Sequence, residues 1–138
     1  MAVAPIRNVR QVLDYALTEM PPEKIYMGIP NYGYSWSLPY RPGTRAISIS
    51  NQYAVELAAK YYVTIRYDEA AQSPWFRYVD ENGQEHEVWF EDARSIRAKL
   101  ELASSRGLYG VGYWNLMRPF PQNWMVLNAL YNIREELS

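Results

Sequence analysis

Two stretches of this sequence constrain the fold most. In each of them, the odd-numbered and the even-numbered positions are both mainly apolar. Residues 108–117 read LYGVGYWNLM, and residues 24–36 read KIYMGIPNYGYSW. A strand with this pattern is buried on both faces, as parallel strands are in α/β proteins. Gly110 and Gly112 share a side of the first stretch with Trp114, and glycines inside a strand are typical of a close approach by a ligand or a backbone. We therefore expect two parallel strands whose carboxyl ends form a ligand site.

Size, charge and composition exclude several classes of protein. The 138 residues are one domain's worth of chain, and the net charge of −1 without a basic stripe argues against nucleic-acid binding. We see no signal peptide and no apolar run of membrane-spanning length. Without cysteine there are no disulfides or thiolate metal sites, and the single histidine, His86, argues against a histidine metal site or a Ser-His-Asp triad. We expect no metal and no cofactor.

Aromatic content is the outlier of the composition. The chain has 13 Tyr and 5 Trp but only 3 Phe. Tyr and Trp combine an apolar ring with a polar group, which suits surfaces that contact sugars or protein partners. The same rings also fill ordinary cores, so composition alone leaves both interpretations open.

Periodicity and capping residues predict the remaining elements. An amphipathic helix is expected over residues 5–20, an irregular loop over 37–48, and a helix capped by Ser50 that runs to about Lys60. The β-branched and aromatic residues 62–67 predict a strand. A helix over residues 92–105 should end at Gly107, and a last helix after Pro121 should place apolar side chains inward, namely Val126, Leu130, Ile133 and Leu137.

The segment Asp80-Glu81-Asn82-Gly83 predicts a β-hairpin turn. With a two-residue Asn82-Gly83 loop, the strands would pair Val79 with His86, Arg77 with Val88, and Trp75 with Phe90. Phe76, Tyr78 and Trp89 would then share the opposite face. In that register, His86 is a half-exposed sheet residue without a catalytic role.

This order of elements indicates an α/β fold with an insertion. Two strand–helix steps of a parallel α/β architecture flank a small antiparallel module, which makes the chain by itself α+β. A parallel sheet of only two strands does not stand alone, so we interpret the chain as the last two βα units of a larger (β/α)₈ barrel.

Three ordered motifs are similar to family 18 glycoside hydrolases, and most of all to their spore-cortex-lytic and spore-germination N-acetylglucosaminidases. Gly28-Ile29-Pro30-Asn31-Tyr32-Gly33 resembles the end of the seventh barrel strand, and residues 67–76 resemble the α+β insertion. Residues 91–99 and 110–114 resemble the next helix and the eighth strand. The resemblance implies a barrel helix and strand over 1–36, the insertion over 37–90, and the last helix, strand and helix over 91–138.

Two family motifs are absent from these residues. The acid motif Asp-x-x-Asp-x-Asp-x-Glu does not occur, and Met-x-Tyr-Asp would lie just before Met1. Tyr34 stands where family chitinases usually have Arg, which favours peptidoglycan over chitin as the substrate. The resemblance thus implies that this chain contributes the wall of a cleft and no catalytic residue, and that it is inactive alone.

The family's mechanism is retaining and uses the N-acetyl group of the substrate as the nucleophile. By resemblance, the substrate-binding residues are Trp114 as the floor beneath the sugar, Tyr32, and Asp68 of the insertion. Further candidates for lining the cleft are Trp36, Trp75 and Tyr113.

Other interpretations stay open at this point. The chain could be a non-catalytic carbohydrate-binding module, part of a chitinase, or a structural domain whose aromatic residues are core. The resemblance implies as partners an N-acetylated glycan and a missing N-terminal part of the barrel, with no membrane. It also implies a secreted enzyme at the cell wall or spore envelope of a spore-forming bacterium. In isolation the chain would leave strand edges unpaired, which predicts a homo-oligomer.

Overall fold

The computed structural model describes residues 1–131. The elements follow in this order: α1 (Ile6–Glu19), the 3₁₀ turn η1 (Pro22–Lys24), β1 (Tyr26–Pro30), β2 (Gly33–Ser37), β3 (Ile47–Ile49), α2 (Asn51–Lys60), β4 (Arg66–Asp68), β5 (Ser73–Val79), β6 (Glu85–Trp89), α3 (Ala93–Ser105), β7 (Gly110–Trp114) and α4 (Pro121–Leu130). The predicted α/β character with an antiparallel insertion is confirmed.

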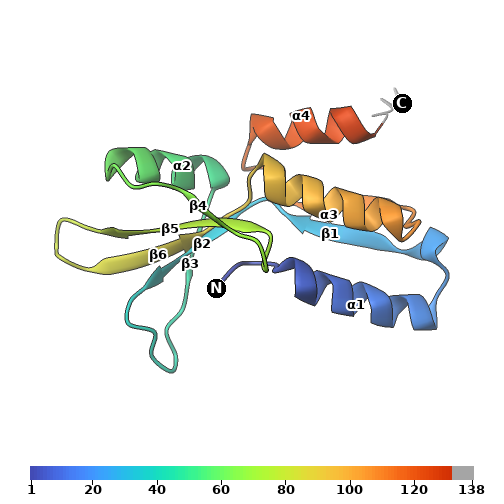
Figure 1. The fold of residues 1–138 in the computed structure, drawn as a ribbon, viewed down its shortest axis with the longest axis horizontal. Coiled ribbons are helices and arrows are strands. Elements are labelled where there is room, and N and C mark those ends of the chain that lie inside the picture. The colour runs from blue at the N-terminus through green and yellow to red at the C-terminus, as the bar shows by residue number, and fades with distance from the viewer. Residues whose placement is uncertain (132–138) are drawn as a thin grey trace.

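The strands form two separate sheets. β1 and β7 pair in parallel, while the second sheet has the order β3-β2-β6-β5-β4 with every neighbouring pair antiparallel. Figure 1 shows α1, α3 and α4 beside the parallel pair at one end, and α2 with the five-stranded sheet at the other. The chain passes from one sheet to the other between Pro30 and Gly33, and it returns through α3.

The parallel strands and their helices share one core. Apolar side chains of α1 and α3 pack here, with Leu13 and Leu100 among the buried ones. Ile25, Met27 and Ile29 are 6%, 4% and 1% exposed, because alternate residues of β1 point toward the helices. The apolar side chains of β1 are therefore covered by the chain's own helices.

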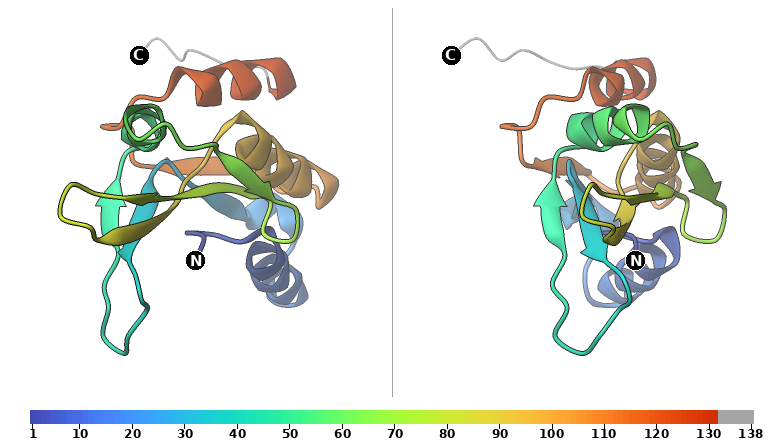
Figure 2. Two further views of the ribbon diagram at one scale, coloured as in Figure 1. Left: turned by 60° about the vertical axis from the view of Figure 1, so that its left-hand side comes forward. Right: turned by 90° about the vertical axis from the view of Figure 1, so that its left-hand side faces the viewer.

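The second core lies between α2 and the antiparallel sheet (Figure 2). Ser50 caps α2 as predicted, accepting a hydrogen bond from the Tyr53 backbone N–H at 3.0 Å. The predicted strand over 62–67 is mostly wrong: Tyr62 has φ of +54° and is 96% exposed. It ends α2 in a Schellman motif, with Val63 N–H bonded to the Ala58 oxygen, so pairing starts only at Arg66.

The predicted hairpin register is wrong by one residue. Trp75 pairs with Trp89, Arg77 with Glu87, and Val79 with Glu85. The cause is the turn: Asp80 accepts hydrogen bonds from the backbone N–H groups of Asn82 and Gln84, and Gly83 has φ of +77°. A type I turn followed by a left-handed glycine makes a three-residue loop instead of two. Consequently Trp89 leaves the face of Phe76 and stacks on Trp75 at 5.6 Å, and His86 pairs with Tyr78 instead of Val79.

Residues 37–48 contain more structure than predicted. β2 extends to Ser37, and β3 pairs with it through Gly33↔Ile49 and Ser35↔Ile47. The five-stranded sheet thus includes residues from Gly33 onward. The predicted last helix begins at Pro121 and ends at Leu130. Val126 packs against the core as predicted, but the prediction for Leu130 is wrong, because it is 41% exposed. Ile133 and Leu137 lie outside the described residues.

Candidate functional site

The carboxyl ends of β1 and β7 border a hollow of about 500 Å³. Gly28 pairs with Gly112 and Pro30 with Trp114, so these residues share the side of the sheet that faces away from the helices. A Cβ added at Gly28 or Gly112 would meet nothing within 4 Å, which means that this face is open. The glycines therefore leave space that Trp114 closes at one end.

Trp114 and Tyr32 both line this hollow. The Trp114 side chain is 72% exposed, although a large aromatic ring is normally buried in a core. Tyr32 is half-buried and packs edge-on against Tyr34 at 5.6 Å between ring centroids. Burial, followed by the hydrogen bond with Tyr34, raises the pKa of Tyr32, so its hydroxyl stays neutral. The site thus offers two rings and a neutral hydroxyl, but no carboxylate.

Tyr113, the next residue along β7, has its ring on the other side of the sheet. The ring packs against Trp124 of α4 at 5.7 Å and contacts the core of the parallel half. Burial raises the pKa of the Tyr113 hydroxyl to about 12. Tyr113 also borders the hollow, with its ring directed away from it.

Asp68 lies in a different place, at the end of β4. Its Oδ1 accepts a hydrogen bond of 2.7 Å from the backbone N–H of Ala71, which closes a local turn. With Trp89 and residues near the N-terminus it lines a second hollow of about 410 Å³. The structure therefore places Tyr32 and Trp114 at one hollow and Asp68 at a neighbouring one, with Val3 lining both.

Trp36 and Trp75 belong to one face of the antiparallel sheet. Tyr34, Trp36 and Tyr40 form an edge-to-face row with ring centroids 6.0 and 5.7 Å apart. Tyr34 also pairs with Trp89, which pairs with Trp75, so an aromatic row crosses three adjacent strands. These rings extend from the hollow along the insertion rather than into it.

Glu87 holds this aromatic face together. Its carboxylate accepts hydrogen bonds from Trp89 Nε1 at 2.7 Å, from Arg77 Nε at 2.9 Å, and from the Tyr40 hydroxyl. Burial alone would raise the pKa of Glu87, but these donors outweigh burial and lower the pKa to about 2. Glu87 is thus a fixed anion that orients rings and not a proton donor at neutral pH.

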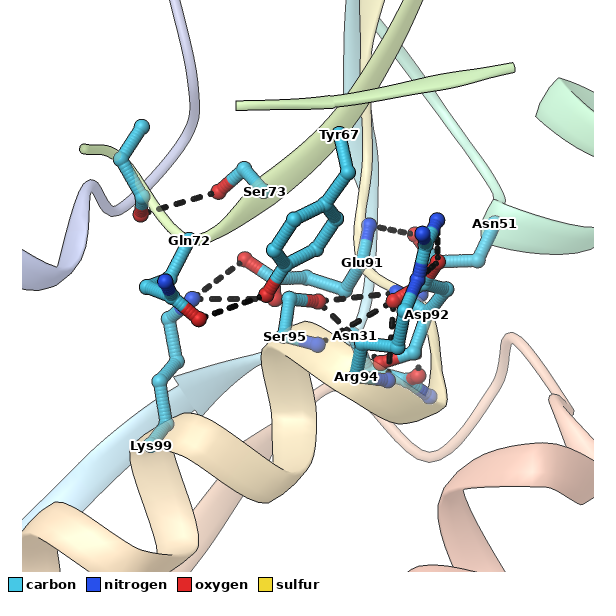
Figure 3. Close-up of polar contacts among 11 residues, drawn as sticks. Asn31, Asn51, Tyr67, Gln72, Ser73, Glu91, Asp92, Arg94, Ser95 and Lys99 are labelled. Carbon is cyan, nitrogen blue, oxygen red and sulfur yellow. Dashed lines mark hydrogen bonds and ion pairs between the residues drawn. The ribbon is translucent and has the colours of Figure 1, made fainter. Parts of the chain in front are cut away.

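Sequence reasoning missed a buried polar network beneath the site (Figure 3). Asn31, Asn51, Glu91 and Lys99 are each at most 2% exposed. Lys99 Nζ lies 3.0 Å from both carboxylate oxygens of Glu91, and burial raises the pKa of this carboxyl against the pull of Lys99. The only signal in the sequence was that Asn31 directly follows a buried strand; its partners are far away in sequence.

No set of three acidic or histidine side chains in residues 1–131 is arranged to hold a metal ion. Within the same residues, no helix has the length and apolarity needed to span a membrane.

A parallel strand pair with an antiparallel sheet inserted between its strands is the arrangement of the last units of an α/β barrel. The chain belongs to the glycosyl hydrolases family 18, whose family model matches residues 2–118.

Several relatives are spore enzymes. The chain is 50% identical over 137 residues to the cortical fragment-lytic enzyme of Bacillus anthracis, covering 99% of this chain and 32% of that protein. The crystal structure of the Bacillus megaterium QM B1551 spore cortex-lytic enzyme SleL matches with a TM-score of 0.94 and 53% identity, over 99% of this chain and 32% of that one. A chitinase from Chromobacterium violaceum matches with a TM-score of 0.86 and 32% identity, over 93% and 39% of the two chains. This chain therefore spans about a third of the length of the spore enzymes.

Proposed function

We propose that this chain forms the glycan-facing wall of a family 18 hydrolase that acts on N-acetylglucosamine-containing glycans. The observation that carries the proposal is the hollow at the carboxyl ends of β1 and β7, which Tyr32 and the exposed Trp114 line together with the open glycine positions. Aromatic rings with a neutral hydroxyl beside them suit a sugar, which has apolar C–H faces and polar edges. Family membership supplies the chemical context.

In this proposal, the chain binds and orients the sugar while other residues supply the proton. Proton transfer needs a donor within hydrogen-bond reach of the glycosidic oxygen. Tyr32 and Trp114 are not acids at neutral pH, and the family's acid motif is absent from these 138 residues. The catalytic Glu and the Asp that orients the N-acetyl group would come from outside this sequence, as would the rest of the barrel.

We propose spore-cortex peptidoglycan as the substrate, ahead of chitin. The relatives named as cortex enzymes are about 50% identical to this chain, whereas the Chromobacterium chitinase is 32% identical. Tyr34 agrees with this choice, because it occupies the position of the usual chitinase Arg. Such an enzyme would act outside the cell, at the spore envelope.

A second candidate is a non-catalytic carbohydrate-binding module. The aromatic rows on the insertion favour it, because stacked rings bind glycans without any acid. The two candidates differ in whether a longer protein containing this chain cleaves the glycan that it binds.

The test compares the full-length protein with the 138-residue chain. Each is incubated with cortical fragments and with a chromogenic N-acetylglucosaminide, and heat-inactivated protein is the control. We expect hydrolysis by the full-length protein and none by the chain alone. If the full-length protein bound the glycan without hydrolysing it, the hydrolase proposal would be wrong and the binding module would be the supported function.

A further inference from the structure

Asn31 fastens the segment that follows β7. Its backbone N–H donates to the Trp114 oxygen at 2.7 Å. Its side-chain Nδ2 donates to the Asn115 oxygen at 3.2 Å and to the Arg118 oxygen at 2.7 Å. A single residue, 2% exposed, thus makes three hydrogen bonds to the five-residue stretch 114–118. Buried amide donors that reach two carbonyls fix the path of a loop, since no water can replace them.

The side-chain oxygen of Asn31 connects the same loop to the insertion. Asn51 Nδ2 donates to Asn31 Oδ1 at 3.4 Å, and Asn51 Oδ1 accepts from the Glu91 backbone N–H at 2.9 Å. Figure 3 shows these side chains meeting at the start of α3. Asn51 begins α2 and Glu91 lies between β6 and α3, so the two amides join both halves of the molecule. Glu91, the last residue in this series of contacts, is in turn held by its ion pair with Lys99.

Apart from Asn31, the loop is held at its two ends, where Trp114 pairs with Pro30 and Phe120 is 2% exposed in the core. Trp114, Leu116 and Met117 are 72%, 67% and 90% exposed, so their side chains contribute little packing. Arg118 makes one side-chain hydrogen bond, to Ser48 Oγ of β3 at 2.8 Å, at an exposed position. The path of residues 115–118, which directly follow Trp114, therefore depends chiefly on the buried amide of Asn31.

We propose that Asn31, which is itself held by Asn51, is a positioning residue that sets the Trp114 indole against the glycan. This inference rests on the proposed function, because the effect assigned to Asn31 can be measured only through the binding or cleavage of a glycan. Asn31 itself lies behind the strand end and does not line the hollow.

A double-mutant cycle in the full-length protein tests this role. Asn31→Ala, Trp114→Ala and the double variant are compared by kcat/KM on cortical fragments, at a temperature where all are folded. We expect Asn31→Ala to lower kcat/KM about 10-fold in the presence of Trp114 but less than about 2-fold in its absence, because coupled residues are not additive. Asn128→Ala, an exposed change of the same chemistry on α4, is the matched control and should leave kcat/KM unchanged.

Amide hydrogen exchange separates positioning from general loss of stability. In Asn31→Ala, exchange should become faster at residues 115–120, while β1, β7 and α3 keep their protection. Should Asn31→Ala not fold, the cycle is run with Asn51→Ala, because Asn51 is linked to the loop through Asn31.

The outcomes distinguish the two proposals. If Asn31→Ala lowered kcat/KM by the same factor with and without Trp114, the positioning role would be overturned. Faster amide exchange throughout the protein would overturn it as well. Either result would leave the proposed function intact. If Trp114→Ala alone left kcat/KM unchanged, the assignment of Trp114 to the glycan site would fail, and the role of Asn31 with it.

Discussion

At the scale of single residues, Glu87 shows how charge organises the aromatic face. Three donors surround a carboxylate whose side chain is 8% exposed, and together they lower its pKa to about 2. A carboxyl whose pKa is lower in the folded state stabilises that state above its unfolded pKa of about 4.5. This contribution is then lost as the pH falls toward 2.

The corresponding prediction concerns Glu87→Gln. At pH 7 the variant should be less stable to denaturant than the wild type, because a neutral amide binds Arg77 and Trp89 less strongly. The difference should shrink as the pH falls from about 5 to about 2, where the wild type loses the charge. Urea unfolding at several pH values measures it.

The control for this prediction is Glu81→Gln. A hydrogen bond from Lys60 is the largest of the effects that lower the pKa of Glu81, also to about 2, but the Glu81 side chain is 68% exposed. Solvent screens such a pair, so its loss should change stability little. An equal effect of both substitutions would contradict the role of the buried cluster.

At the scale of elements, the start of β2 depends on Gly33. A Cβ at this position would lie 2.6 Å from the Trp89 oxygen and 2.7 Å from the Phe90 Cβ, so the strand would have to move away from β6. We expect Gly33→Ala to destabilise the protein by about 2 kcal/mol, as overpacking commonly does. Thermal and urea unfolding measure this cost.

Gly112→Ala is the matched control for Gly33→Ala. It adds the same methyl group in β7, where nothing lies within 4 Å, so stability should change by less than about 0.5 kcal/mol. Because Gly112 lines the hollow, the same variant should impair activity on the glycan. A large loss of stability in Gly112→Ala would show that the open face is packed in the protein.

How well the elements could be predicted depended on whether their signals were local. The helical periodicity of α1 and α3 can be read within one stretch of sequence each. The same holds for β1 and β7, which are apolar on both faces. The structure confirms these elements. The hairpin register was missed because the Asp80 carboxylate selects a longer turn than Asn82-Gly83 alone indicates. β3 has only three residues, and its pairing with β2 has no local signal.

The residues of the candidate site also differ in whether a local sequence signal marks them. Tyr32 and Trp114 could be chosen because each belongs to a recognisable motif, and the structure places both at one hollow. The contact of Asn31 with Arg118 spans 87 residues of sequence, and no pattern in a single sequence indicates such a pair.

At the scale of the whole molecule, the parallel sheet predicts how the chain behaves alone. In the described residues β1 and β7 pair only with each other, so each has an outer edge without a partner. Tyr26 and Trp114 are 63% and 72% exposed on the open face. Unpaired strand edges recruit other chains. We expect the isolated 138-residue chain to form dimers or larger assemblies at micromolar concentration, measured by light scattering after size exclusion. A monomer with slow amide exchange over residues 26–30 would contradict this.

The central claim is that the chain presents a glycan-binding wall with Trp114 at its centre. The most direct test is kcat/KM on cortical fragments for Trp114→Ala in the full-length protein, beside Trp124→Ala, an indole 37% exposed on α4 outside the hollow. We predict a loss of about 10-fold or more for Trp114→Ala, or roughly 1.4 kcal/mol of barrier, with a nearly unchanged Tm. Trp124→Ala should retain kcat/KM. Equal activity of Trp114→Ala and the wild type would contradict the account, and so would a Trp114→Ala protein that simply unfolds.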